Sequence, residues 1–308
     1  MAKKGALGCS FPVLILVIVI FIGLAVIGII SGPLIRGIET PFTIAQPAIH
    51  LPAAEVFHIF GFPVRNSLIS TWITMAVIVI SSIIITRRMK LVPGRVQYAF
   101  EFILGSLYNF CKSVAGEENG RKFFPVVATI FLFVIFNGWL SLIPGFGSIE
   151  VLNAEGHHVE LLRGANTDIN TPLAIAVLSF VFVEYFGLKA HGIRYLGKFF
   201  NLGQFLGGIG QLLRGKFKSG LNNIFVGFIN VFVGFIEILS ELIRVLSFTF
   251  RLFGNMTAGE ILLLMITFLV PFVFGTIFYG LELLVGLVQA LIFSGLTLVF
   301  LTSATAHH

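Results

Sequence analysis

The sequence predicts an all-α, polytopic membrane protein that ends in a hairpin of two long, tilted helices. The 308-residue chain is 57% hydrophobic and only 11% charged, with a mean hydropathy of +1.01. Soluble globular proteins have roughly a quarter charged residues. Apolar runs long enough to cross a bilayer recur along the chain, and basic residues collect in the segments between them.

The first apolar run, Phe11–Ile30, follows the basic start of the chain. Its 20 residues can span a bilayer, and they exceed the apolar core of a signal peptide, which has roughly 7–15 residues. The length favours an N-terminal membrane anchor, residues 1–36, over a cleaved signal sequence, an alternative that the sequence leaves open. Residues 37–66 contain four prolines and are expected to form an irregular segment on the outer surface.

A core domain, residues 67–308, holds the remaining helices. Apolar runs predict transmembrane helices at about 68–85, 123–143 and 172–188. Ahead of the second run, residues 96–114 have spaced apolar positions among charged ones. This spacing predicts an amphipathic helix that lies on the inner membrane surface.

Charges in the loops predict which side of the membrane each loop faces. Segments 86–122 and 189–218 are rich in Lys and Arg, whereas 147–171 carries four carboxylates against a single cation, Arg163. Positively charged loops face the cytoplasm. The basic segments are therefore expected inside and the acidic one outside, which also explains the net charge of +6 without a nucleic-acid partner.

The end of the chain predicts two unusually long helices, at about 223–268 and 272–301, that form an antiparallel hairpin around Pro271. The first would be about 69 Å long at 1.5 Å per residue, against a hydrocarbon core of about 30 Å. The segment must either break or cross the membrane at a steep tilt. The prediction is a tilted hairpin.

Patterns that resemble nucleotide or metal sites lack essential parts. Gly210–Lys216 matches a phosphate-binding loop, but Phe217 stands where Ser or Thr would hold Mg²⁺, and no apolar strand precedes it. The histidines lack the spacing of a zinc site, and no Ser/His/Asp set or CxxC motif is visible. We expect no nucleotide, metal or other cofactor to bind, and no catalytic centre in this chain.

Charged residues inside the hairpin are its most informative feature. Arg251 stands in the apolar stretch SFTFRLFGNM, where an arginine costs about 2.5–3.5 kcal/mol on insertion scales. Other charged residues accompany it: Glu237, Glu241, Arg244, Glu260 and Glu282. Such groups mark either an ion path or static ion pairs between helices. Glu241 and Arg244, three residues apart, are expected to pair with each other.

Helical geometry separates these polar residues by face. At about 100° per residue, Ser247 and Asn255 share the face of Arg251. Glu237 stays close to that stripe, whereas Glu260 lies on the opposite face. The first group forms an inner polar track along the helix.

Folding the hairpin at Pro271 brings residues of its two helices to the same level. Glu260 precedes Pro271 by 11 residues and Glu282 follows it by 11. Arg251 and Gln289 lie 20 residues before and 18 after the turn. Glu260 and Glu282 are therefore expected to form an outer polar track, with Arg251 between the two tracks. Because neither track spans the membrane alone, a cation would have to be carried past the arginine.

Four motifs of the sequence are similar to those of a known family. They are Arg251–Glu260 (RLFGNMTAGE), Gln289–Phe293 (QALIF), Asp168–Leu173 (DINTPL) and Asn137–Gly145 (NGWLSLIPG), in the expected order. From about Leu68 to its end, the chain resembles subunit a of F-type ATP synthases.

The resemblance implies a non-catalytic stator subunit with two aqueous half-channels against a rotating ring of c subunits, whose carboxyl groups carry the ion. It implies Arg251 as the essential arginine, with Gln289 as its neighbour. It implies Glu260 and Glu282 as the proton relay of the outer half-channel. Polar positions linked to the arginine and to the inner exit would be Glu237, Ser247 and Asn255. The implied partners are the c-ring, the peripheral-stalk b subunits and the lipid of a bacterial plasma membrane.

Two other function classes fit parts of the sequence. A self-contained secondary transporter could use Arg251 to bind an anionic substrate, but such transporters usually have two related halves, and no internal repeat is visible. A structural anchor would leave the carboxyl groups unexplained.

The sequence departs from the family pattern at one relay position. In relatives one of the two relay positions is often histidine, whereas this chain has glutamate at both. The sequence leaves the ion open between H⁺ and Na⁺.

Overall fold

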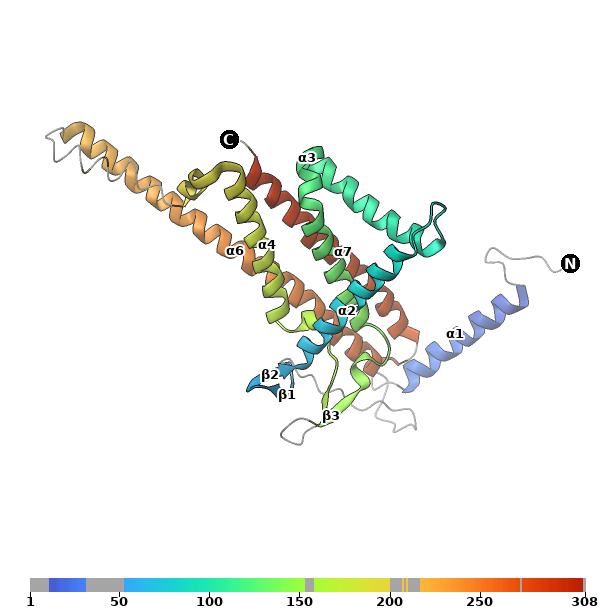
Figure 1. Ribbon diagram of the computed structural model, residues 1–308. Helices are drawn as coiled ribbons and strands as arrows, with labels where there is room; N and C mark the ends of the chain where they lie inside the picture. Colours follow the sequence, from blue (N-terminus) through green and yellow to red (C-terminus); the bar gives the residue numbers. More distant parts are fainter. Residues whose placement is uncertain are drawn as a thin grey trace. The chain divides into compact units, whose positions relative to one another are not determined.

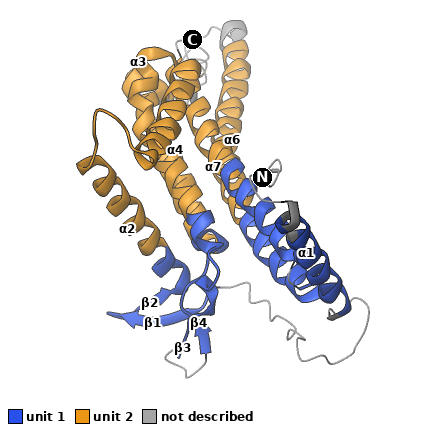
Figure 2. Cartoon of the chain, turned by 90° about the vertical axis from the view of Figure 1, so that its right-hand side faces the viewer, with its two compact units in different colours: residues 1–70, 137–167, 254–288 blue, residues 71–136, 168–253, 289–308 orange. Residues whose placement is uncertain are grey.

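The computed structural model describes residues 11–31, 53–152, 158–199, 207, 209, 217–271 and 273–306 (Figure 1). Five of its helices are long and apolar enough to cross a membrane. The predicted fold class, an all-α polytopic membrane protein, is therefore confirmed. The phosphate-loop-like motif Gly210–Lys216 lies outside the described residues. The chain forms two compact units, which Figure 2 colours separately.

The first unit comprises residues 1–70, 137–167 and 254–288. It contains helix α1, two β-hairpins, short 3₁₀ turns and the turn between the last two helices. Its elements are α1 (Phe11–Ser31), β1 (Glu55–Ile59), β2 (Phe62–Arg65), η1 (Phe146–Ser148), β3 (Glu150–Leu152), β4 (His158–Glu160) and η2 (Ala165–Thr167). Helix α1 covers the first apolar run of the sequence.

The β-hairpins were not predicted. Strands β1 and β2 pair antiparallel within the segment expected to be irregular. Their turn is formed by Phe60 and Gly61, which both have positive φ angles, 49° and 81°, as tight hairpin turns require. Strands β3 and β4 form the second hairpin. The side-chain amide of Asn66 donates to the main-chain carbonyl of Glu160 (3.2 Å), which ties the end of this hairpin to the first turn of α2.

The second unit comprises residues 71–136, 168–253 and 289–308. It contains most of the length of the long helices, which continue into the first unit where their ranges overlap it. The helices are α2 (Asn66–Arg87), α3 (Arg95–Ser141), α4 (Asn170–His191), α6 (Phe217–Leu269) and α7 (Val273–Thr305), with the 3₁₀ segment η3 (Gly192–Lys198) after α4.

Helix α3 contains a sharp kink at Gly116, whose φ of 79° and ψ of 169° are not helical. The kink separates the predicted amphipathic helix from the following apolar helix. After it the chain passes so close to the preceding turn that a Cβ on Gly120 would meet the carbonyl oxygen of Cys111 at 2.9 Å. Phe123, 1% exposed, then packs edge-to-face on Phe186 of α4. The expected pair of helices is present, joined by one glycine.

The C-terminal hairpin is present as predicted. Helix α6 runs unbroken for 53 residues and α7 for 33, and Pro271 lies between them. A break in the first helix, the alternative that the sequence left open, is not observed. Large apolar side chains on α6 are exposed, among them Phe228, Phe232 and Phe235, which is the surface expected of a helix that faces lipid.

Candidate functional site

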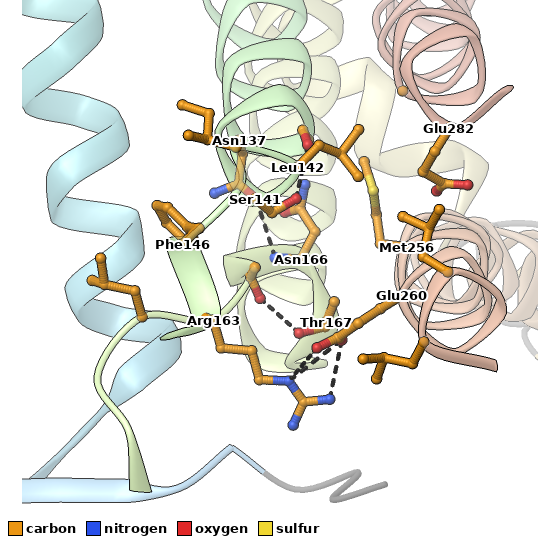
Figure 3. Close-up of a pocket in the computed structure, with 18 of the residues that line it drawn as sticks. Asn137, Ser141, Leu142, Phe146, Arg163, Asn166, Thr167, Met256, Glu260 and Glu282 are labelled. Carbon is orange, nitrogen blue, oxygen red and sulfur yellow. Dashed lines mark hydrogen bonds and ion pairs between the residues drawn. The ribbon is translucent and has the colours of Figure 1, made fainter. Parts of the chain in front are cut away.

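A polar cavity of about 330 Å³ lies within the first unit (Figure 3). Its walls come from the end of α3, the segment 160–167 and the turns of α6 and α7 next to the hairpin bend. The indole N–H of Trp139 donates to the main-chain carbonyl of Leu283 (3.1 Å), which joins α3 to α7 beside it. Both carboxyl groups of the predicted outer track, Glu260 and Glu282, line this cavity.

Glu260 forms an ion pair with Arg163. The Arg163 Nε donates to both carboxylate oxygens of Glu260 (3.2 and 3.4 Å), and Nη2 donates to Oε2 (3.1 Å). Arg163 is only 8% exposed, and its main-chain N–H donates to the hydroxyl of Ser70 (3.2 Å). This role of Arg163 was not predicted. In the sequence, Arg163 stands out only as the single Lys or Arg among the four carboxylates of segment 147–171.

Glu282 has a different environment from Glu260. It is 6% exposed, and its carboxyl group lies against the main chain of Gly259, where an added Cβ would overlap it. Because Gly259 precedes Glu260 directly, the two glutamates are at the same level of the hairpin, as the count from Pro271 predicted. No cationic side chain among the described residues pairs with Glu282.

An amide side chain completes the polar wall of this cavity. The main-chain N–H of Asn166 donates to Oδ1 of Asn137 (3.3 Å). The side chain of Asn166 is 1% exposed, and within the described part of the chain neither its oxygen nor its nitrogen has a hydrogen-bond partner. A buried polar group without a protein partner is normally hydrated. The cavity is therefore suited to hold water.

Arg251 lies on α6 within the second unit and is partly exposed. Its guanidinium carbon is 5.9 Å from the ring centroid of Phe248. No carboxylate among the residues that the structure describes pairs with it. Gln289, on α7 of the same unit, is also partly exposed. Within the described part of the chain, this arginine therefore has no counter-ion.

A second cavity, of about 560 Å³, also lies within the second unit. Glu237, Glu241 and Arg244 of α6 line it, together with Phe300 of α7. The predicted pair is confirmed, because Nη1 of Arg244 lies 2.7 Å from Oε2 of Glu241. Arg244 also stacks on Phe300, with its guanidinium carbon 3.9 Å from the ring centroid. The structure places Glu237 at this cavity but not the other two residues of the inner track, of which Ser247 is exposed and Asn255 partly exposed.

Comparison with known proteins identifies the family. The family model described as ATP synthase A chain matches residues 68–302. The chain belongs to this family. Similar relatives include ATP synthase subunit a of Geobacter sp. (strain M21), 32% identical over 255 residues, 82% of this chain and 94% of the relative. That of Geotalea daltonii is 31% identical over 231 residues, 75% and 83% of the two chains. That of Moorella thermoacetica is 25% identical over 260 residues, 84% and 99%.

Family membership and the five apolar helices make the chain an integral membrane subunit of the ATP synthase membrane sector, which translocates protons in ATP synthesis. Family membership excludes the alternative of a self-contained secondary transporter. The family match begins at residue 68, so α1 and the β1–β2 hairpin precede the matched part of the chain.

Proposed function

We propose that this subunit a passes protons through two half-channels against a ring of c subunits in the bacterial plasma membrane. The outer half-channel is the cavity lined by Glu260 and Glu282. The inner one is the track of Glu237, Ser247 and Asn255. Each proton is taken up from the outer cavity by a carboxyl group of the ring, carried round, and released to the inner track. The peripheral-stalk b subunits hold this subunit static against the ring.

The observation that carries the proposal is that Arg251 has no carboxylate partner among the residues that the structure describes. Arg163 and Arg244 each have a carboxylate of this chain within 3.1 Å, whereas no described residue neutralises Arg251. A guanidinium does not deprotonate in proteins and cannot pass a proton on. It does attract a carboxylate strongly in a medium of low dielectric constant. Arg251, with Gln289 as its neighbour, is suited to attract each ring carboxylate that has released its proton and to block leakage between the half-channels.

The test is the replacement of Arg251 by Ala in the assembled complex in membrane vesicles. ATP synthesis driven by a proton gradient should be abolished while the amount of assembled complex is unchanged. Arg251→Lys should restore little, because the ammonium group is titratable and lacks the planar fork. Arg87→Ala, at an exposed position at the end of α2, is the control and should synthesise ATP normally. Coupled synthesis near the wild-type rate in Arg251→Ala would refute the proposal.

The transported ion is tested separately. Vesicles are energised with a pH gradient, with and without a sodium gradient, and ATP formation is measured. Proton transport predicts synthesis that follows the pH gradient and is unchanged by sodium. Synthesis that requires the sodium gradient would replace H⁺ by Na⁺ in the mechanism and would leave the role of Arg251 in place.

A further inference from the structure

The ion pair between Arg163 and Glu260 gives the outer cavity a component that the proposed function does not use. We propose that Arg163 is a positioning residue of the outer proton path and acts through Glu260. This inference rests on the proposed function of the cavity as the outer half-channel. It concerns how one carboxyl group of that half-channel is held and neutralised.

The contact with Arg163 fixes the carboxyl group of Glu260 in place. Arg163 contacts Glu260 through two nitrogens, Nε and Nη2, at 3.1–3.4 Å. A two-nitrogen contact fixes both the position and the plane of a carboxyl group. The arginine is itself held, because it is 8% exposed and its main-chain N–H donates to Ser70 at the start of α2. The carboxyl group of Glu260 is thus tied to a loop that is anchored to another helix.

The two glutamates that line the cavity differ in their charged partners. Glu260 has a cationic partner, whereas no described cation pairs with Glu282, which is 6% exposed. In a site of low dielectric constant, two nearby carboxyl groups without a counter-ion repel each other when both are ionised. Arg163 neutralises Glu260, so the two glutamates that line the cavity do not both carry an uncompensated charge.

The ion pair of Arg163 and Glu260 lies at a cavity and not in a packed interface. The ion pair lines a space of about 330 Å³ together with Asn166, whose buried amide has no hydrogen-bond partner among the described residues. A water molecule in the liquid takes about 30 Å³, so the cavity has room for several. An ion pair that only joined two elements would need no hydrated space next to it. Here the pair contacts the medium through which protons would move.

The experiment measures passive proton flow through the membrane sector of the whole complex after the catalytic sector has been stripped from vesicles. A potassium diffusion potential drives protons from the outer face, and a pH-sensitive dye reports the rate. Arg163→Gln should slow the flow by about tenfold to a hundredfold, as expected when a proton-transfer group is displaced by about 1 Å. Arg163→Lys should restore only part of the rate, because lysine keeps the positive charge but lacks the planar fork that holds the Glu260 carboxyl.

Arg65→Gln is the matched control. Arg65 lies in β2 of the same unit and is partly exposed, and no carboxylate of the described residues pairs with it. The substitution removes the same side chain from the same unit. It should not change the rate of proton flow.

The deciding comparison is a double-mutant cycle with Glu260→Gln. If Arg163 acts through Glu260, the double variant should conduct no more slowly than Glu260→Gln alone, since the cycle is then strongly non-additive. Rate losses that multiply would show that Arg163 acts independently of Glu260 and would overturn the proposal. Normal flow in an assembled Arg163→Gln complex would overturn it as well.

Should Arg163→Gln fail to assemble, the double variant gives the answer. It removes both members of the ion pair, so neither is left as an unpaired charge, and it should assemble and conduct like Glu260→Gln. A double variant that also fails to assemble would make Arg163 a folding element only, against the proposal. The half-channel function is checked independently with Glu282→Gln: normal flow in that variant would reject the outer half-channel itself, whatever the result for Arg163.

Discussion

The carboxyl group of Glu282 lies directly against the main chain of Gly259, so that α6 contributes no side chain of its own to this contact with α7. Glycine is required here for close approach and not for an unusual backbone conformation, since the residue is inside a regular helix. The contact holds Glu282 at the level of Glu260 in the hairpin. This relationship makes Gly259 a position where one methyl group should disturb the outer cavity.

Gly259→Ala should slow passive proton flow while leaving the complex assembled. The added methyl group overlaps the Glu282 carboxyl, which must move away from its present position. Gly280→Ala is the control, because a Cβ there meets nothing within 4 Å. Equal flow in the two variants would show that the position of Glu282 does not limit proton uptake. The measurement is the dye assay in stripped vesicles.

Arg244→Gln should lower the stability of the subunit by about 1–3 kcal/mol, the cost of removing one partner of a buried polar group. Glu241 is 5% exposed and would lose the positive charge that lies 2.7 Å from its Oε2. Glu241→Gln should be milder, because a neutral amide replaces the charge and the exposed part of Arg244 can be hydrated. Thermal unfolding of the purified complex in detergent measures the difference. Arg251→Gln serves as the comparison and should not be destabilising, so an equal loss there would contradict the assignment of distinct roles.

The loop charges predict opposite sides for Lys90 and Glu150. Single cysteines at these exposed positions should react with an impermeant thiol reagent from opposite faces of the membrane, position 90 from the cytoplasmic side and position 150 from outside. The background needs Cys9 and Cys111 replaced by Ala. Labelling of both positions from one face would make the predicted topology wrong.

Gly116→Ala should destabilise the subunit by about 1–3 kcal/mol, the cost of holding a residue with a Cβ in a positive-φ, extended backbone region that is essentially restricted to glycine. The φ of 79° at this position forms the kink of α3. Gly105→Ala, in the same helix, adds a methyl group with nothing within 4 Å and should leave stability unchanged or slightly higher, because alanine is the better helix former. Equal melting temperatures for both variants would show that the kink can move to another residue.

The helices and the hairpin register could be predicted because both depend on local patterns. The length of each apolar run indicates a transmembrane helix. The equal number of residues from Pro271 predicted that Glu260 and Glu282 lie at the same level of the hairpin. The partner of Glu260 could not be predicted, because Arg163 is 97 residues away in the chain and only the tertiary fold brings it close. The β1–β2 hairpin was missed because its prolines indicated irregular structure, although Pro63 sits within an exposed two-stranded sheet, where a proline is tolerated.

The unbroken length of α6 ties this subunit to the lipid around it. Its 53 residues correspond to about 80 Å of helix, more than twice the thickness of a hydrocarbon core of about 30 Å. A long helix adjusts to a thinner or thicker bilayer by changing its tilt, at a cost of fractions of a kcal/mol per Å of mismatch. Arg251 is part of this rigid rod, so a change of tilt shifts the depth of its guanidinium group. We therefore predict that acyl-chain length tunes proton translocation in this protein. Reconstitution in lipids of graded chain length should give an optimum of coupled ATP synthesis.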